Sequence, residues 1–535
     1  MQENKAVACK TILATVAALA LTACVAYESQ PLDDVPGDEP GTVWVTIGAD
    51  ARDVVQEAIE RGAIVGTFHP AADDGPVLVL EIERRHLAAL TELMHVEFNR
   101  CSGYSAHDSF KEAASAYDPE KVAAAMNKTV TYNIDNEAAV SALLPTISQS
   151  NIVSTISYMS TQYTNRYHTT SNGTAAALWL RDTWRSYANA SGRYDVTVEL
   201  YYHNSTSQPS VIMTIPGDWS ADEVVVIGGH LDSTAGGGTG PNTPAPGADD
   251  NASGIATVSE VARVLLTEGF FPDRTVKFMA YAAEEVGLRG SAEIADDFAA
   301  QGIDVVGVLQ LDMTNYHGSS QDIALIADYT NGAQNAFIGD LIDAYFPALV
   351  WTYSSCGYSC SDHASWTAAG YAASIAFESQ VGQHNPYIHT SQDTLAHSDS
   401  TGAHAMKFAR LATAYVAELA KGDFTDDWTP PSGATTELLP DALGVYETHH
   451  YGPFSAQASS SFTARLDSVG YADVYVRFGA PPTTTEYNCR PYSFDALEEC
   501  DLVTPAADVD IYVMVRGFMA SYTLKLAYFD SAQAP

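Results

Sequence analysis

Three short apolar runs in the middle of the chain each end in side chains that bind metal ions. Residues 224–229 run into His230 and Asp232, residues 276–281 into Glu284 and Glu285, and residues 305–311 into Asp312. Short β-rich apolar runs are typical of buried parallel strands, and an open α/β sheet places its ligands at the carboxyl ends of such strands. The sequence therefore predicts that acids and a histidine from three strand ends meet in one crevice.

Two further loops add one ligand each. Residues 247–254 supply Asp250, and residues 389–394 supply His389. Zinc binds imidazole nitrogen and carboxylate oxygen, and two zinc ions about 3.5 to 4 Å apart can share a bridging carboxylate and a bridging hydroxide. Three carboxylates and two neutral imidazoles balance two Zn²⁺ and one hydroxide. The set therefore indicates a hydrolase with two zinc ions.

Two acids are left over from this ligand count. Asp232 lies two residues beyond His230 and is placed to accept the other ring N–H of that histidine. Glu284 adjoins Glu285, and a carboxylate beside a metal-bound water is the natural general base. Taken alone, a His-x-Asp pair is usually a surface or capping pair, and an adjacent Glu-Glu usually starts a solvated helix. The whole ordered set favours a metal centre.

The net charge and the N-terminal residues indicate where the protein resides in the cell. The chain has 66 acidic against 26 basic residues, so we expect it to repel nucleic acid and anionic lipid surfaces. Residues 11–23 are uncharged and too short to span a bilayer, which suits the apolar part of an export signal. Residues 21–24 resemble the bacterial lipobox, which predicts a signal peptide over 1–23 and lipidation of Cys24. An ordinary signal peptide that contains a cysteine is the alternative.

Close cysteine pairs predict two disulfides in an exported protein, Cys356 with Cys360 and Cys489 with Cys500. A zinc site on the first pair would need two more soft ligands, and no candidates are present. Cys101 is left over.

Changes in the predicted pattern of helices and strands divide the chain into domains. Residues 24–125 hold a tether and an α+β pattern, with strands at 43–47 and 77–82 and helices at 51–62 and 84–96. This part of the chain resembles a removable prosegment of roughly a hundred residues; a permanent accessory domain is the alternative. Residues 130–422 alternate helix and strand, which predicts a doubly wound, mixed but mainly parallel sheet flanked by helices. A linker at 423–440 precedes a β-sandwich over 441–535, with short strands at 460–466, 473–478, 509–515 and 521–529.

Six segments carry a resemblance to a known family. They are GGHLDST at 228–234, APGADDNASG at 245–254, MAYAAEEVGLRGS at 279–291, LQLDMTNY at 309–316, CGYSCSDHASW at 356–366 and NPYIHTSQDTL at 385–395. These segments resemble the M28 family of zinc aminopeptidases over residues 132–399, which implies the zinc exopeptidase fold. The tail resembles the bacterial pre-peptidase C-terminal domain.

The resemblance implies a role for each residue. Asp250 would bridge both zinc ions, Glu285 and His389 would complete one site, and His230 and Asp312 the other. Glu284 would be the general base, the Asp250–Asn251 peptide would be cis, and Tyr358 would stabilise the tetrahedral intermediate. A substrate pocket maps onto Tyr358 and seven others: Met313, Ile326, Cys356, Cys360, Ile375, Phe377 and Ile388. Two pocket positions that are aromatic in a secreted member of the family are Val381 and His384 here.

These expectations define one function. We expect a secreted or surface aminopeptidase that hydrolyses the N-terminal peptide bond, prefers apolar residues such as Leu, and uses a zinc-bridging hydroxide as nucleophile. Its partners would be peptide or protein N-termini, and we expect a monomer. It would lie at the cell surface or outer membrane, held there only by its lipid anchor. Processing could then release it from the cell. The alternatives are a one-zinc glutaminyl cyclase and an inactive binding protein. No Gly-x-Ser-x-Gly or His-Glu-x-x-His motif points to other hydrolases.

Overall fold

The computed structural model of the 535-residue chain describes residues 41–69, 76–98, 103–116, 118–193, 195–236, 239–424, 431, 433–491 and 497–533. The predicted signal peptide, Cys24 and Cys101 lie outside the described residues. Among the residues that are described, no helix combines the length and the apolar character needed to cross a membrane.

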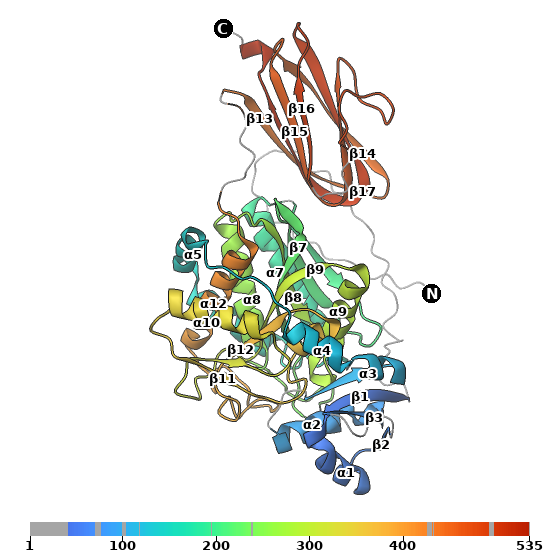
Figure 1. Cartoon of the computed structure of the whole chain (residues 1–535), viewed down its shortest axis with the longest axis vertical. Helices are drawn as coiled ribbons and strands as arrows, with labels where there is room; N and C mark the ends of the chain where they lie inside the picture. The colour runs from blue at the N-terminus through green and yellow to red at the C-terminus, as the bar shows by residue number, and fades with distance from the viewer. Residues whose placement is uncertain are drawn as a thin grey trace, which may run out of the picture. The chain divides into compact units, whose positions relative to one another are not determined.

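An eight-stranded mixed sheet forms the central domain, residues 130–424 (Figure 1). Its order is β11-β10-β12-β9-β7-β8-β6-β5. The strands in chain order are β5 (Thr197–Tyr201), β6 (Ser210–Ile215), β7 (Ser220–His230), β8 (Arg274–Tyr281), β9 (Asp304–Leu311), β10 (Ile323–Ile326), β11 (Trp351–Ser354) and β12 (Ala373–Phe377). The four middle strands β12, β9, β7 and β8 run parallel to one another. This confirms the prediction of a mixed sheet.

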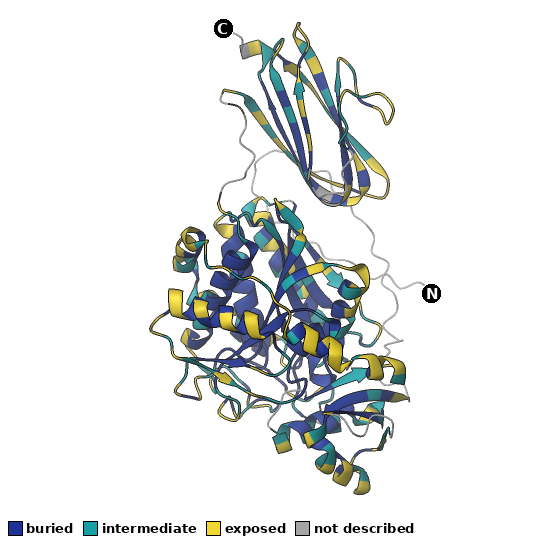
Figure 2. Ribbon diagram, in the orientation of Figure 1, coloured by how far each residue is buried: buried dark blue, intermediate teal, exposed yellow. Residues whose placement is uncertain are grey.

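Helices cover both faces of this sheet because its middle strands are apolar on both sides. Val225 and Ile227 of β7 face one core and Val224 and Val226 face the other, as the alternation of strand residues requires. The first core includes α5 (Glu137–Leu143), α6 (Gln149–Gln162), α7 (Ser171–Ser191), α8 (Ala252–Thr267), α10 (Gly332–Tyr345) and α12 (Ala403–Ala420). The second includes α9 (Arg289–Gln301) and α11 (His363–Ala369). Figure 2 shows the buried strands between partly exposed helices.

The N-terminal module, residues 41–126, has its own sheet in the order β2-β3-β1-β4. Its elements are β1 (Thr42–Gly48), α1 (Arg52–Glu60), β2 (Gly66–Phe68), β3 (Val77–Glu83), α2 (Leu87–Phe98), β4 (Tyr104–His107), α3 (Phe110–Ala116) and α4 (Pro119–Met126). The four elements predicted here are present. Strands β2 and β4 were not predicted, because three or four residues are too few to show a period.

The C-terminal module, residues 433–533, holds β13 (Thr435–Leu443), β14 (Glu447–Ala456), β15 (Ser461–Phe478), β16 (Leu497–Val503) and β17 (Val509–Tyr528). They belong to one antiparallel sheet. The prediction of short strands only is wrong: β15 and β17 each join two predicted strands, because the ladder continues through a bulge between Val469 and Tyr471. The linker prediction is too long by six residues, since β13 begins at Thr435. Its Pro440 is tolerated because β13 lies at the sheet edge.

Both predicted disulfides are confirmed. Cys356 is bonded to Cys360 in the central domain, and Cys489 is bonded to Cys500 in the C-terminal module.

Candidate metal centre

The structure brings all five predicted metal ligands to the carboxyl edge of the central strands. His230 is the last residue of β7, Asp312 follows β9, and Glu285 lies in a short 3-10 turn after β8. These three strands are neighbours in the order β9-β7-β8, so their ends converge. Asp250 lies just before α8, and His389 lies in the loop between β12 and α12.

The ligand atoms form two trios that share Asp250. In the first trio, His230 Nε2 lies 2.9 Å from Asp250 Oδ1 and 3.3 Å from Asp312 Oδ1. In the second trio, His389 Nε2 lies 3.2 Å from Asp250 Oδ2 and 2.9 Å from Glu285 Oε2. The two oxygens of Asp250 therefore face different histidines, which is the geometry of a bridging carboxylate.

The spacing and chemistry of these atoms fit two zinc ions. Tetrahedral zinc with ligands at 2.0–2.2 Å separates neighbouring ligand atoms by about 3.3 Å, close to the distances found here. All five side chains are buried, and within the described residues the facing nitrogen and oxygen atoms of each trio make no hydrogen bond. Buried polar atoms without hydrogen bonds are costly. A cation at each trio would satisfy them.

Electrostatics lead to the same conclusion for the metal-free site. Burial raises the pKa of Glu285 to about 7, and burial together with the charge of Glu285 raises the pKa of Glu284 well above its usual value. Burial alone would lower the pKa of His230, but Asp312 and Glu284 raise it far above 6.5. These raised pKa values mean that the site binds protons, which offset the negative charge of its buried carboxylates. Bound cations would take their place.

Backbone strain is concentrated at this edge. Ala283, Met313 and His389 have φ angles of 56°, 53° and 54°, a left-handed conformation that residues other than glycine rarely adopt. Each is a ligand or lies within two residues of one, and strain of this kind clusters at functional sites. The Asp250–Asn251 peptide bond is cis, as the family resemblance implies.

Asp232 anchors the turn that carries the two glutamates. Its carboxylate accepts the backbone N–H of Glu284 at 3.0 Å and that of Glu285 at 3.2 Å. Its distance to His230 Nδ1 is 3.5 Å, and that nitrogen makes no hydrogen bond within the described residues. Asp232 therefore hydrogen-bonds to the backbone of the glutamate turn, and its carboxylate also lies beside the His230 ring. Glu284 itself is fully buried beside the trios.

Several buried supporting residues were not predicted. Asp393 accepts the backbone N–H groups of Asp249 and Asp250, both at 3.0 Å, and so holds the backbone at Asp250 in place. Glu378 accepts N–H groups of Tyr316 and Asn385 at 2.6 and 3.0 Å, which ties together two loops of the site. Glu378 directly follows β12, and Asp393 lies four residues after His389. These positions in the sequence could have identified both acids as candidates. Buried Arg166 donates to three carbonyls, of Leu231, Pro246 and Gly247, and lies in no motif.

The residues predicted to line a substrate pocket lie together in one apolar cluster. Its buried members are Met313, Ala324, Ile326, Cys360, Ile375, Phe377 and Ile388, with Cys356 and Val381 packed against them. Six of the seven predicted aliphatic, aromatic and cysteine positions are in the buried set, and the seventh, Cys356, adjoins it. The family resemblance named these positions, which come from several places in the chain: Met313 follows β9, Ile326 ends β10, and Ile375 and Phe377 lie in β12.

The N-terminal module contacts the ligand turn and Tyr358. Thr91 of α2 donates its hydroxyl to the carbonyl of Glu285 at 2.8 Å, and the His95 ring lies 4.5 Å from the His389 ring. The Tyr358 hydroxyl donates to Thr46 Oγ1 of β1 at 2.8 Å. In this structure the module therefore engages three residues of the predicted active site.

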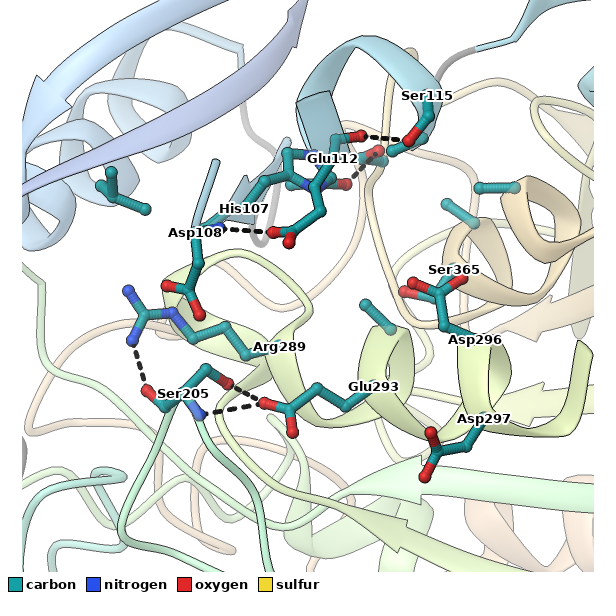
Figure 3. Close-up of a pocket in the computed structure, with 18 of the residues that line it drawn as sticks. His107, Asp108, Glu112, Ser115, Ser205, Arg289, Glu293, Asp296, Asp297 and Ser365 are labelled. Atoms are coloured by element: carbon teal, nitrogen blue, oxygen red, sulfur yellow. Dashed lines mark hydrogen bonds between the residues drawn. The ribbon is translucent and has the colours of Figure 1, made fainter. Parts of the chain in front are cut away.

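A cavity of about 460 Å³ lies between the N-terminal module and the central domain (Figure 3). Its charged lining includes Arg289 and Glu293, which fix the segment at Ser205 through hydrogen bonds of 2.8 and 3.0 Å. Tyr358 and Ser359 belong to its wall, but none of the five metal ligands does. This cavity is therefore distinct from the metal centre.

Comparisons with known proteins agree with this geometry. The family model described as peptidase family M28 matches residues 210–414. The chain is 35% identical over 292 residues to a probable leucine aminopeptidase of Trichophyton verrucosum, which covers 54% of this chain and 78% of that protein. It is 34% identical over 316 residues to leucine aminopeptidase 1 of Arthroderma otae, covering 56% and 82%. The LapA aminopeptidase structure of Legionella pneumophila covers 71% of this chain and 99% of its own, with 28% identity and a TM-score of 0.61. The chain therefore belongs to peptidase family M28 and is a metalloaminopeptidase.

Proposed function

We propose that this protein is an exported two-zinc aminopeptidase that releases apolar residues such as Leu from the N-termini of peptides. The observation that carries the proposal is the pair of buried trios, each with one histidine, that share the two oxygens of Asp250.

The proposed metal sites differ in their ligands. His230, Asp250 and Asp312 would hold one zinc ion, and Asp250, Glu285 and His389 the other. Zinc at these positions would lower the pKa of water and polarise the scissile carbonyl. Glu284 belongs to neither trio, so its carboxylate is not needed as a metal ligand.

Glu284 is the proposed general base. It adjoins ligand Glu285 and is held by Asp232 through its backbone N–H at 3.0 Å. It would take a proton from the attacking water and deliver that proton to the leaving amine. Burial raises the pKa of Glu284 well above its usual value, and a raised carboxylate pKa is a common property of groups that move protons in active sites.

The apolar cluster supports a preference for apolar first residues. Its walls, Met313, Ile326, Ile375, Phe377 and Ile388, carry no charge. Burying a Leu side chain there would be worth about 1.5 to 3 kcal/mol, whereas a charged side chain would lose its hydration. Unblocked Leu and Met should therefore be good first residues, and Asp and Lys poor ones.

The N-terminal module supports a latent precursor. The hydroxyl of Tyr358, the proposed oxyanion-stabilising residue, donates a hydrogen bond to Thr46 Oγ1 of that module. It could not then donate to substrate. We further propose that cleavage within residues 24–125 activates the enzyme and, since Cys24 would carry the lipid, frees it from the membrane.

The decisive experiment measures purified protein on aminoacyl-nitroanilides with and without chelator. Release of free Leu that stops with chelator and returns with zinc would support the proposal. Equal cleavage of acetyl-Leu-nitroanilide would contradict an aminopeptidase. One bound zinc per chain, with cyclisation of N-terminal Gln and no release of amino acids, would instead support the glutaminyl cyclase.

A further inference from the structure

His384 lies at the border between the apolar cluster and the metal centre. Its ring meets the Phe377 ring edge-on, with 5.5 Å between the ring centres, and Phe377 is a wall of the cluster. Its main electrostatic neighbours are Asp250 and His389 of the second trio. Only 6% of the residue is exposed. A polar ring is therefore placed among otherwise apolar walls.

Hydrogen bonding fixes the tautomer of this imidazole. The backbone N–H of Gly382 donates to His384 Nδ1 at 3.3 Å, so Nδ1 carries the lone pair. The proton must then lie on Nε2, on the other side of the ring. Burial lowers the pKa of His384 to about 4, so the ring is neutral at pH 7.

The Nε2–H group is a buried donor without an acceptor. Within the described residues, His384 Nε2 has no hydrogen-bond partner. A buried polar atom left unpaired is costly, so an unpaired donor at the edge of a binding site is available to a ligand. The two histidines that belong to the trios, His230 and His389, face carboxylates. His384 faces none at bonding distance.

We infer that His384 Nε2–H is a specificity-determining donor for the side chain of the first substrate residue. The favoured side chains are apolar near the backbone and end in an acceptor oxygen, as in glutamine. This inference rests on the proposed function, because it assigns the substrate class of the same pocket. It extends the expected preference from purely apolar residues to uncharged residues with a terminal acceptor.

Three nitroanilide substrates test the inference on the processed enzyme: those of Leu, norleucine and Gln. Norleucine resembles Gln in length but has no acceptor, so the Gln-to-norleucine ratio of kcat/KM isolates the hydrogen bond. We expect His384→Phe to lower this ratio about 10-fold, while Leu and norleucine stay within about 2-fold. His384→Gln, which can place an N–H near the same position, should restore most of the ratio. Zinc content and melting temperature of each variant check that the site is intact.

Two results would overturn the inference. One is an equal loss for all three substrates in His384→Phe, which would assign the donor to the peptide main chain. The other is an unchanged ratio. If the variants do not fold, the wild-type enzyme still tests the inference. Cleavage of the Gln substrate more than about 100-fold more slowly than that of norleucine would contradict a hydrogen bond from His384 to the Gln side chain. If wild-type enzyme releases none of the three residues, it is the proposed function that fails.

Discussion

At the scale of single residues, the two neighbouring glutamates have different contacts and should have different roles. Glu285 faces His389 Nε2 at 2.9 Å in the second trio, whereas Glu284 belongs to neither trio. Glu284→Gln keeps the shape but removes the base. We therefore expect kcat to fall about 10² to 10⁴-fold with both zinc ions retained. Glu285→Gln should weaken zinc binding first.

The measurement is zinc content by atomic emission beside kcat for each variant. Glu293→Gln is a matched control, because Glu293 lines the separate cavity and hydrogen-bonds to Asn204 and Ser205. Loss of zinc in Glu284→Gln, together with full zinc and low activity in Glu285→Gln, would reverse the assignment.

The same residues predict how metal removal changes stability with pH. In the metal-free protein the pKa of Glu285 is raised from 4.5 to about 7 by burial, and those of His230 and His389 are raised by facing carboxylates. The folded state then binds more protons than the unfolded state, so the free energy of unfolding falls as pH rises. For Glu285 this loss spans about pH 4.5 to 7.

We therefore expect the melting temperature of chelated enzyme to drop across this range while that of the zinc-bound enzyme changes less. Asp250, whose pKa is lowered by His230 and His389 despite burial, acts only at more acidic pH. Melting curves at pH 5 and 7, with chelator or zinc, give the comparison. A chelated protein that becomes more stable at pH 7 would contradict the charge assignment.

At the scale of elements, the sequence predicted the parts whose pattern is local. Runs of apolar residues predicted β7, β8 and β9. The polar residues at the ends of these runs were then predicted to be metal ligands. The long strands β15 and β17 were divided because a bulge interrupts the period while pairing continues. Arg166 was missed because its three carbonyl partners lie 65 to 81 residues away along the chain. His384 could be noted as a pocket position, but its unpaired Nε2 depends on the folded surroundings.

Contacts of β1 and α2 with the active site give a prediction for these elements. Thr46→Val keeps the shape of a buried residue but removes the acceptor of the Tyr358 hydroxyl. We expect the uncleaved enzyme with this change to turn over faster than uncleaved wild type, because Tyr358 is freed. Removal of the whole module after folding should raise kcat further. Thr67→Val, at the exposed position of β2, is the control. Equal kcat for precursor and processed enzyme at matched zinc would eliminate the latent precursor.

At the scale of the whole molecule, the chain has separate cores. The core of the C-terminal module is made of residues from Leu443 to Tyr528, and the two central cores end at Ala420 and Ala373. The C-terminal core includes Cys500 of the Cys489–Cys500 disulfide, and the predicted metal ligands lie in the central domain. Stability and catalysis should therefore be separable between the central domain and the C-terminal module.

Removing the two disulfides one at a time tests this separation. Cys489→Ser with Cys500→Ser opens a short loop, of sequence separation 11, in the C-terminal module. The module should lose about 3 kcal/mol of stability, while kcat/KM on Leu-nitroanilide stays unchanged. Cys356→Ser with Cys360→Ser changes the wall of the apolar cluster and the segment that carries Tyr358, so it should lower kcat/KM.

A chain ending after Phe424 completes the test. It keeps Asp423, whose backbone pairs with Phe271, and Phe424, whose ring meets Phe270. We expect it to retain the full kcat/KM and the melting transition of the central domain, because the central cores lose no buried residue. Calorimetry and nitroanilide assays on the three proteins measure both properties. A truncated chain that loses zinc or activity would show that the C-terminal module supports the metal centre, and the separation of cores would then not extend to function.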